Sequence, residues 1–346
     1  MTDKVRLAFV AQAQSCETLG SPLTAHILRL LADELTSGPV AERVLGWRGG
    51  PYAAADAVAL RLAAGLHGLV LSQQDTELQA FYHAPEAHSD AKARHILRAA
   101  ILRHPLPLLQ WLDSPPQTNE VRRSAALIAA GHWLTARFGL PLVLSELGAS
   151  AGLNLIWDQY CLNLATQSYG LVDSEITLTP VWRGAMPQHC PPQVAARAGV
   201  DLAPINPKTE IVRLLSYIWP DQSDRLTRTQ NAAALAATTL TTPVERADAI
   251  DWLGRRLAVP HPRRLHVIFH TIAWQYFTPE AQNRGAALLA AAGACASRDA
   301  PLAHLSIEAD GQPNGAAMTL RLWPGDHRIH LGRMDFHGRW VEWQGG

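Results

Sequence analysis

The sequence predicts an α/β fold with a mostly parallel sheet, preceded by a helical N-terminal region. Apolar residues recur at helical spacing over residues 3–138, and short apolar runs alternate with helical patterns after residue 141. The last apolar runs have no helix between them. The length of 346 residues exceeds that of most single cores. We therefore expect a helical domain over residues 1–118 and an α/β domain over residues 119–346.

The N-terminal pattern predicts five or six helices joined by short loops. In LTAHILRLLADEL the apolar residues fall on one face of a helix, and Gly-Pro, Gly-Ser-Pro and Pro-Pro breaks separate such segments. Thr118 or Asn119 can cap a further helix that ends at Gly139, before Pro141. That helix leads into the first predicted strand.

Seven short apolar runs are typical of sheet strands. They are LVLSELG, AGVDL, VERAD, LHVIFH, LAHLSIE, MTLRLW and WVEW. Helical patterns over 209–219, 225–240, 250–257 and 279–296 separate the middle runs, which predicts a parallel sheet with helices on both faces. The final three runs predict an antiparallel C-terminal edge within residues 301–346.

The overall charge and the cysteines argue against several classes of protein. Thirty basic residues balance thirty acidic ones, so no net field favours nucleic acid or an anionic membrane. The four cysteines form no CxxC pair, and no segment reaches the ~18 apolar residues of a membrane span. We expect a cytoplasmic protein that acts on a small molecule, with no nucleic-acid or membrane partner.

A glycine turn follows the first predicted strand, in Glu146-Leu147-Gly148-Ala149-Ser150-Ala151-Gly152. As a cofactor loop it would offer free backbone N–H groups, with a helix beginning near Leu153. As a nucleophile elbow, G-x-S-x-G would expose the Ser150 hydroxyl. A third interpretation is that small residues only allow close packing. The helical rather than strand-rich upstream region favours the cofactor loop.

These residues resemble the first motif of class I S-adenosylmethionine-dependent methyltransferases, with Ser150 in place of the middle glycine. The resemblance implies a Rossmann-like fold that binds S-adenosylmethionine. It assigns cofactor contacts to seven residues, of which Asp201 in AGVDL would bind the ribose and Asp248 in VERADA would lie beside the adenine. The seven are Glu146, Gly148, Ser150, Gly152, Asn154, Asp201 and Asp248.

Two features depart from that pattern. Asp201 lies 49 positions after Gly152, whereas the ribose acid follows by ~20 residues in related dinucleotide folds. We expect residues 159–193 to be an inserted hairpin over the site, and Asp173 is the alternative ribose ligand. The helix that methyltransferases place after the fifth strand is also missing after Glu308.

Candidate catalytic residues follow the LHVIFH strand. His270 would be a base or an orienting group, because histidine titrates near neutrality and strand ends point into the crevice. Tyr276 is the second catalytic candidate, and Trp274 and His337 are candidates for substrate contacts. All of these could instead be ordinary core or turn residues. His266 and His270 lack a third ligand at a recognisable spacing, so no metal site is predicted.

Over nearly the whole chain, ELGASAGLNL, HTIAWQYF and WPG followed by DFHGRWVEW are similar to a bacterial family of uncharacterised proteins. We expect an S-adenosylmethionine-binding protein that methylates a small molecule. The first alternative is a serine esterase in which Ser150 works with Asp248 and either His270 or His337. The second is a binding or scaffold module without catalysis.

Overall fold

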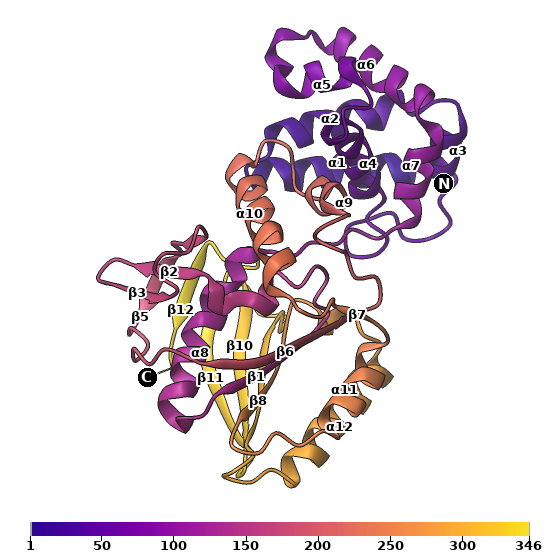
Figure 1. Ribbon diagram of the computed structural model, residues 1–346. Coiled ribbons are helices and arrows are strands. Elements are labelled where there is room, and N and C mark those ends of the chain that lie inside the picture. Colours follow the sequence, from indigo (N-terminus) through magenta and orange to yellow (C-terminus); the bar gives the residue numbers. More distant parts are fainter. Residues whose placement is uncertain (1, 346) are drawn as a thin grey trace. The chain divides into compact units, whose positions relative to one another are not determined.

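The computed structural model describes residues 2–345 (Figure 1). The chain divides into two compact units, Met1–Thr118 with Glu210–Gln230, and Asn119–Thr209 with Asn231–Gly346. The first boundary coincides with the expected one. Residues 210–230, however, belong to the helical unit, so the α/β unit is interrupted. Within residues 2–345, no helix combines the length and the apolar character that a membrane crossing requires.

The helical unit has seven α-helices within residues 2–118, more than the five or six predicted. They are α1 (Thr2–Thr18), α2 (Pro22–Glu34), α3 (Pro39–Leu45), α4 (Val58–Leu71), α5 (Thr76–His83), α6 (Asp90–Arg103) and α7 (Pro105–Asp113), with the short η1 (Pro85–Ala87). One additional break precedes Asp75, whose carboxylate caps α5 by accepting from Leu78 N. Another falls at His104, because Pro105 begins α7.

Residues 210–230 complete the core of the helical unit. They form α9 (Ile211–Ser216) and the first half of α10 (Ser223–Thr239), which passes into the α/β unit. The Asp221 carboxylate accepts hydrogen bonds from Ser21 Oγ and from Leu23 N. The Tyr217 ring packs edge-on against Trp111, with 5.4 Å between centroids. The segment is therefore tied to both ends of the N-terminal helical region.

A nine-stranded sheet forms the α/β unit, in the order β5-β12-β11-β10-β9-β8-β1-β6-β7. Its strands are β1 (Leu142–Leu147), β5 (Val181–Gly184), β6 (Val194–Asp201), β7 (Glu245–Arg246), β8 (Leu265–Thr271), β9 (Leu302–Glu308), β10 (Ala316–Trp323), β11 (His327–Met334) and β12 (Trp340–Trp343). The strands from β7 to β9 are parallel. This confirms the mostly parallel sheet, and it places the point where the strand order reverses between β1 and β8.

Helices cover the sheet from both sides. Figure 1 shows α8 (Ser124–Phe138) on one side and α11 (Ala249–Leu257) and α12 (Pro279–Ala294) on the other. Leu147 belongs to the core cluster with residues of α11 and α12, and Ser145 accepts a hydrogen bond from Arg256 of α11. Because strand side chains alternate, Glu146 between them faces the α8 side. The two faces of β1 therefore lead to different surroundings.

The predicted antiparallel C-terminal edge is confirmed, since β9, β10, β11 and β12 pair as a meander. Strand β11 was not among the predicted strands, because His and Arg residues occupy its exposed positions. Nor was β5, which extends the edge by pairing with β12.

The excursion over residues 159–193 is more than a hairpin. Strands β2 (Cys161–Leu164), β3 (Gln167–Gly170) and β4 (Thr177–Leu178) form a second, three-stranded sheet. His132 of α8 packs against Tyr169 of β3 at 5.1 Å between ring centroids, and its Nδ1 accepts from Cys190 N. The excursion is thus anchored on α8 before the chain enters β6.

Candidate functional site

The glycine turn follows β1 with left-handed backbone angles. Gly148, Ser150 and Gly152 have φ of 71°, 51° and 74°. A Cβ on Gly148 would come within 2.6 Å of the Ala273 side chain, so this position requires glycine. The α-helix expected near Leu153 is absent. Residues 154–159 instead form the 3-10 helix η3 (Asn154–Gln159), which is kinked at Ile156.

The backbone N–H groups of this turn bind the protein itself. Gly148 N and Ala149 N donate to Val200 O, Ser150 N to Asp201 Oδ2, Gly152 N to Ala149 O, and Leu153 N to Asn119 Oδ1, at 2.7–3.0 Å. Asn119 therefore holds the turn and does not cap a helix. The expectation of free N–H groups is wrong for these five positions. The turn is closed on the end of β6.

The predicted ribose and adenine acids also bind backbone groups. Asp201 accepts from Ala203 N at 2.8 Å in addition to Ser150 N. Asp248 is the N-cap of α11, and its carboxylate accepts hydrogen bonds from Ile250 N and Asp251 N, each at 2.9 Å. Asp173, the alternative ribose ligand, is exposed between β3 and β4. Asn154 accepts from Ser124 Oγ at 2.9 Å.

Glu146 is the most unusual group at the turn. Only 1% of it is exposed, and its Oε2 has no hydrogen-bond partner within residues 2–345. Burial, reinforced by the charge of Asp201, raises the pKa of Glu146 well above its usual value, although Arg123 opposes this shift. Ser150 Oγ is a second buried atom that lacks a partner in the described chain. Two buried polar atoms at the turn are therefore left without hydrogen bonds within residues 2–345.

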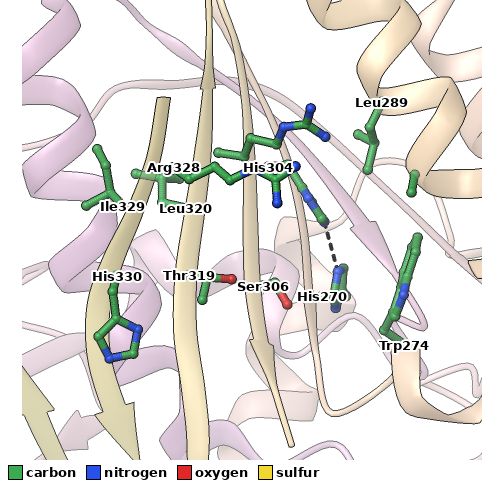
Figure 2. Close-up of a pocket in the computed structure, with 12 residues that line it drawn as sticks. His270, Trp274, Leu289, His304, Ser306, Thr319, Leu320, Arg328, Ile329 and His330 are labelled. Carbon is green, nitrogen blue, oxygen red and sulfur yellow. Dashed lines mark hydrogen bonds between the residues drawn. The ribbon is translucent and has the colours of Figure 1, made fainter. Parts of the chain in front are cut away.

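A second cluster lies at the ends of β8 and β9. His270 Nδ1 contacts Glu308 Oε1 at 2.7 Å, and His270 Nε2 contacts His304 Nε2 at 2.9 Å (Figure 2). Glu308 Oε1 also accepts from Ala273 N and Trp274 N, at 2.9 and 3.0 Å. Burial acts to raise the pKa of Glu308, but the hydrogen bond and charge of His270 and the two backbone N–H groups leave it below the usual value. Glu308 is thus ionised at neutral pH.

The ionised carboxylate fixes the direction of the first of these hydrogen bonds. Glu308 accepts from His270 Nδ1–H, and we assign the second hydrogen bond in the direction from His304 Nε2–H to His270 Nε2, the arrangement in which the His270 ring carries one proton. Burial, with smaller effects of His270 and Arg321, lowers the pKa of His304 well below its usual value, so His304 is neutral. Its Nδ1 then carries a lone pair. We call Glu308, His270 and His304 the histidine relay.

The histidine relay opens into a groove of about 540 Å³ on the α12 side of the sheet. Residues of β8, β9, β10, β11 and α12 line it. The groove is open because β9 connects directly to β10, with no helix to cover this part of the sheet. Trp274 forms one wall and stacks on His270 at 4.9 Å and 19°. Sequence reasoning found His270 and Trp274 but missed Glu308 and His304, although both lie in the predicted LAHLSIE strand.

The structure does not bring all predicted site residues together. Glu146 is the partner of Phe269 in the sheet register, so it and His270 point to opposite faces. Tyr276 is 76% exposed. His337 lies in the loop between β11 and β12. Its Nδ1 is 3.8 Å from Oε2 of Glu120, which precedes α8 in the chain. Glu146 and His270 therefore belong to separate clusters, and Ala273, whose N–H group binds Glu308, lies beside Gly148.

The residues proposed for a serine esterase do not assemble around Ser150. Both ring nitrogens of His270 are used within the histidine relay, and Asp248 caps α11. Ser150 Oγ itself has no basic partner among the described residues. Residues 2–345 also contain no group of three His, Cys, Asp or Glu that could hold a metal ion.

Comparison with known proteins shows the family of this chain. Residues 6–343 match the family described as an uncharacterized protein conserved in bacteria (DUF2332). Neither the curated proteins nor the solved structures gave a match. The matched segment covers nearly the whole chain and includes the glycine turn, the histidine relay and the C-terminal meander. The chain therefore belongs to the bacterial family DUF2332.

Proposed function

We propose that the α/β unit is a class I methyltransferase-like domain that binds S-adenosylmethionine and methylates a small molecule. The observation that supports this most is the parallel order β7-β6-β1-β8-β9, with an acid and a glycine turn at the end of β1. In open α/β sheets, ligands bind outside the carboxyl ends of the strands where the order reverses. That position here is the end of β1 beside β8.

The unpartnered atoms at the turn fit such a cofactor. S-adenosylmethionine carries an ammonium and a sulfonium, and the buried Glu146 carboxyl, whose pKa is raised by burial and by the charge of Asp201, would gain from a cation beside it. Glu146 Oε2 and Ser150 Oγ are buried atoms of the turn that have no hydrogen-bond partner in the described chain and would be available to a ligand. The turn itself would contribute shape rather than N–H groups, because its amides already bind β6 and Asn119. Asp201 would act by holding the turn closed.

When bound, the cofactor supplies an electrophilic methyl group, and the protein must align the acceptor and take up its proton. For the second task we propose the histidine relay, which lies on the other face of the sheet from Glu146, so the methyl donor would have to reach it around the ends of the strands. His304 Nδ1 accepts a proton while His304 Nε2–H passes its own to His270 Nε2. The positive charge then rests on His270, next to the Glu308 carboxylate.

Titration calorimetry of the full chain with S-adenosylmethionine tests the proposal. Binding of a cation should ionise Glu146, so we expect release of a proton, seen as a dependence of the heat on the buffer's ionisation enthalpy. Glu146→Gln should weaken binding by about tenfold, the effect of one lost charge-assisted contact, and abolish the proton release. Glu175→Gln, at an exposed carboxylate in the same unit, is the control. No heat at millimolar ligand would contradict the proposal.

A further inference from the structure

The open face of the sheet carries two aligned rows of polar side chains. His270, Ser306, Thr319 and His330 are register partners across β8, β9, β10 and β11. His304, Arg321 and Arg328 are register partners in the next row, across β9, β10 and β11. Figure 2 shows Ser306 and Thr319 between His270 on one side and His330 on the other. All seven side chains line the groove.

Charge is distributed unevenly along this groove. At the β9 end, the histidine relay combines the ionised Glu308 with a lone pair on His304 Nδ1. In the middle of the row, on β10, Arg321 forms an ion pair with Asp326 and lies over the Trp323 ring at 4.5 Å. Arg328 lies at the β11 end. Arg328 also lies near Asp326, but forms no ion pair within residues 2–345. The groove thus has a proton-accepting end and a cationic end.

The spacing of the two ends sets the size of a ligand. His304 and Arg328 are two strands apart in the same row, which is about 10 Å between backbones. The long Arg328 side chain can extend over part of that distance. Ser306 and Thr319 supply hydroxyl groups along it, and the Trp274 ring forms a flat wall beside His270.

We propose that this groove binds a small acid that also carries a hydroxyl group. The carboxylate of the acid binds Arg328 and His330, and its hydroxyl donates to His304 Nδ1. A sheet face that is only solvated needs polar residues. It does not need His304 to be hydrogen-bonded to His270, a buried histidine that itself binds the Glu308 carboxylate. The identification of this acid as the methyl acceptor rests on the proposed function, whereas its binding to the groove does not.

Titration of the full chain with 4-hydroxybenzoate, without S-adenosylmethionine, tests the inference by calorimetry. Its neutral matched compound is 4-hydroxybenzamide, which keeps the ring and the hydroxyl. We expect the acid to bind at least about tenfold more tightly than the amide, because only the acid forms a charge-assisted bond with Arg328. Arg328→Gln should remove that preference. Arg333→Gln, on the same strand but paired with Asp310, should keep it.

A second variant probes the other end of the groove. His304→Asn should weaken the acid and the amide by equal factors, because both compounds carry the hydroxyl that His304 accepts from. Equal binding of acid and amide to the parent protein, or an unchanged preference in Arg328→Gln, would overturn the inference. A protein that binds the acid through Arg328 but does not bind S-adenosylmethionine would support the groove site and refute methyl transfer.

Discussion

Replacing Glu308 by glutamine tests whether the histidine relay contains an ionised carboxylate. The substitution keeps the shape of the side chain but removes its charge. Glu308 Oε1 accepts three hydrogen bonds, from His270 Nδ1, Ala273 N and Trp274 N. A bond to a charged group contributes about 1 kcal/mol more than a neutral one, but the cost of burying the charge opposes this gain, so we expect a net loss of about 1 kcal/mol at pH 7. The Glu308 side chain is only 12% exposed, so solvent screens little of this.

The sign of the pH dependence follows from the lowered pKa of Glu308. A carboxylate with a folded pKa below its unfolded value stabilises the protein above the unfolded pKa of about 4.5. This stabilisation is lost as the pH falls through the lower folded pKa. The difference in unfolding free energy between the parent and Glu308→Gln should therefore be full at pH 7 and shrink in acid, below the folded pKa.

Equilibrium urea unfolding, followed by tryptophan fluorescence at pH 7 and at acid pH, measures both quantities. Glu175→Gln is the matched control, because this exposed carboxylate should change stability by less than about 0.5 kcal/mol. An equal loss at both pH values would show that the amide disturbs packing and that charge is unimportant. No loss at pH 7 would show that Glu308 is not held as an ion.

Three further predictions concern the glycine turn and the strand ends. Gly148→Ala should cost about 2 to 4 kcal/mol by urea unfolding, since a Cβ meets Ala273 at a left-handed φ, whereas Gly139→Ala, with open space around it, should cost only about 1 kcal/mol. Asp248→Ala should cost about 1 kcal/mol through loss of the α11 cap, and a change within error would contradict that role. A fluorophosphonate should not label Ser150, because its hydroxyl has no basic partner; labelling lost in Ser150→Ala would revive the esterase alternative.

Much of the sheet could be predicted from sequence because its parallel strands are buried on both faces. LVLSEL and LHVIFHT are fully buried, and such strands appear as continuous apolar runs. The strand β11 of the C-terminal meander could not be found in this way, because its exposed positions carry His327, Arg328 and His330. The break in the α/β unit at residue 210 also left no signal, since a helix of either unit has the same amphipathic pattern.

The site could be predicted only in part, for a different reason. His270 was recognisable as a polar residue at a strand end, but its partner Glu308 lies 38 positions away and depends on the register of β9. For the same reason, the sequence did not show that Glu146 and His270 lie on opposite faces of the sheet. The face of each side chain follows from which residues are paired across the strands. Sequence also gave no sign that the N–H groups of the glycine turn bind Val200 and Asp201. Such closure depends on how β6 ends beside β1.

The discontinuous helical unit has a consequence for synthesis of the chain. Residues 1–118 leave the ribosome first. Asp221, which binds Ser21, and Tyr217, which packs on Trp111, follow about a hundred residues later. At about 5 to 20 residues per second, this delay is on the order of 10 s. During that interval the first seven helices lack α9, and β1 and β6 of the other unit are already being made. The helical unit therefore cannot be complete until residue 230 has been made, and neither unit can be produced intact by cutting the gene once at residue 118.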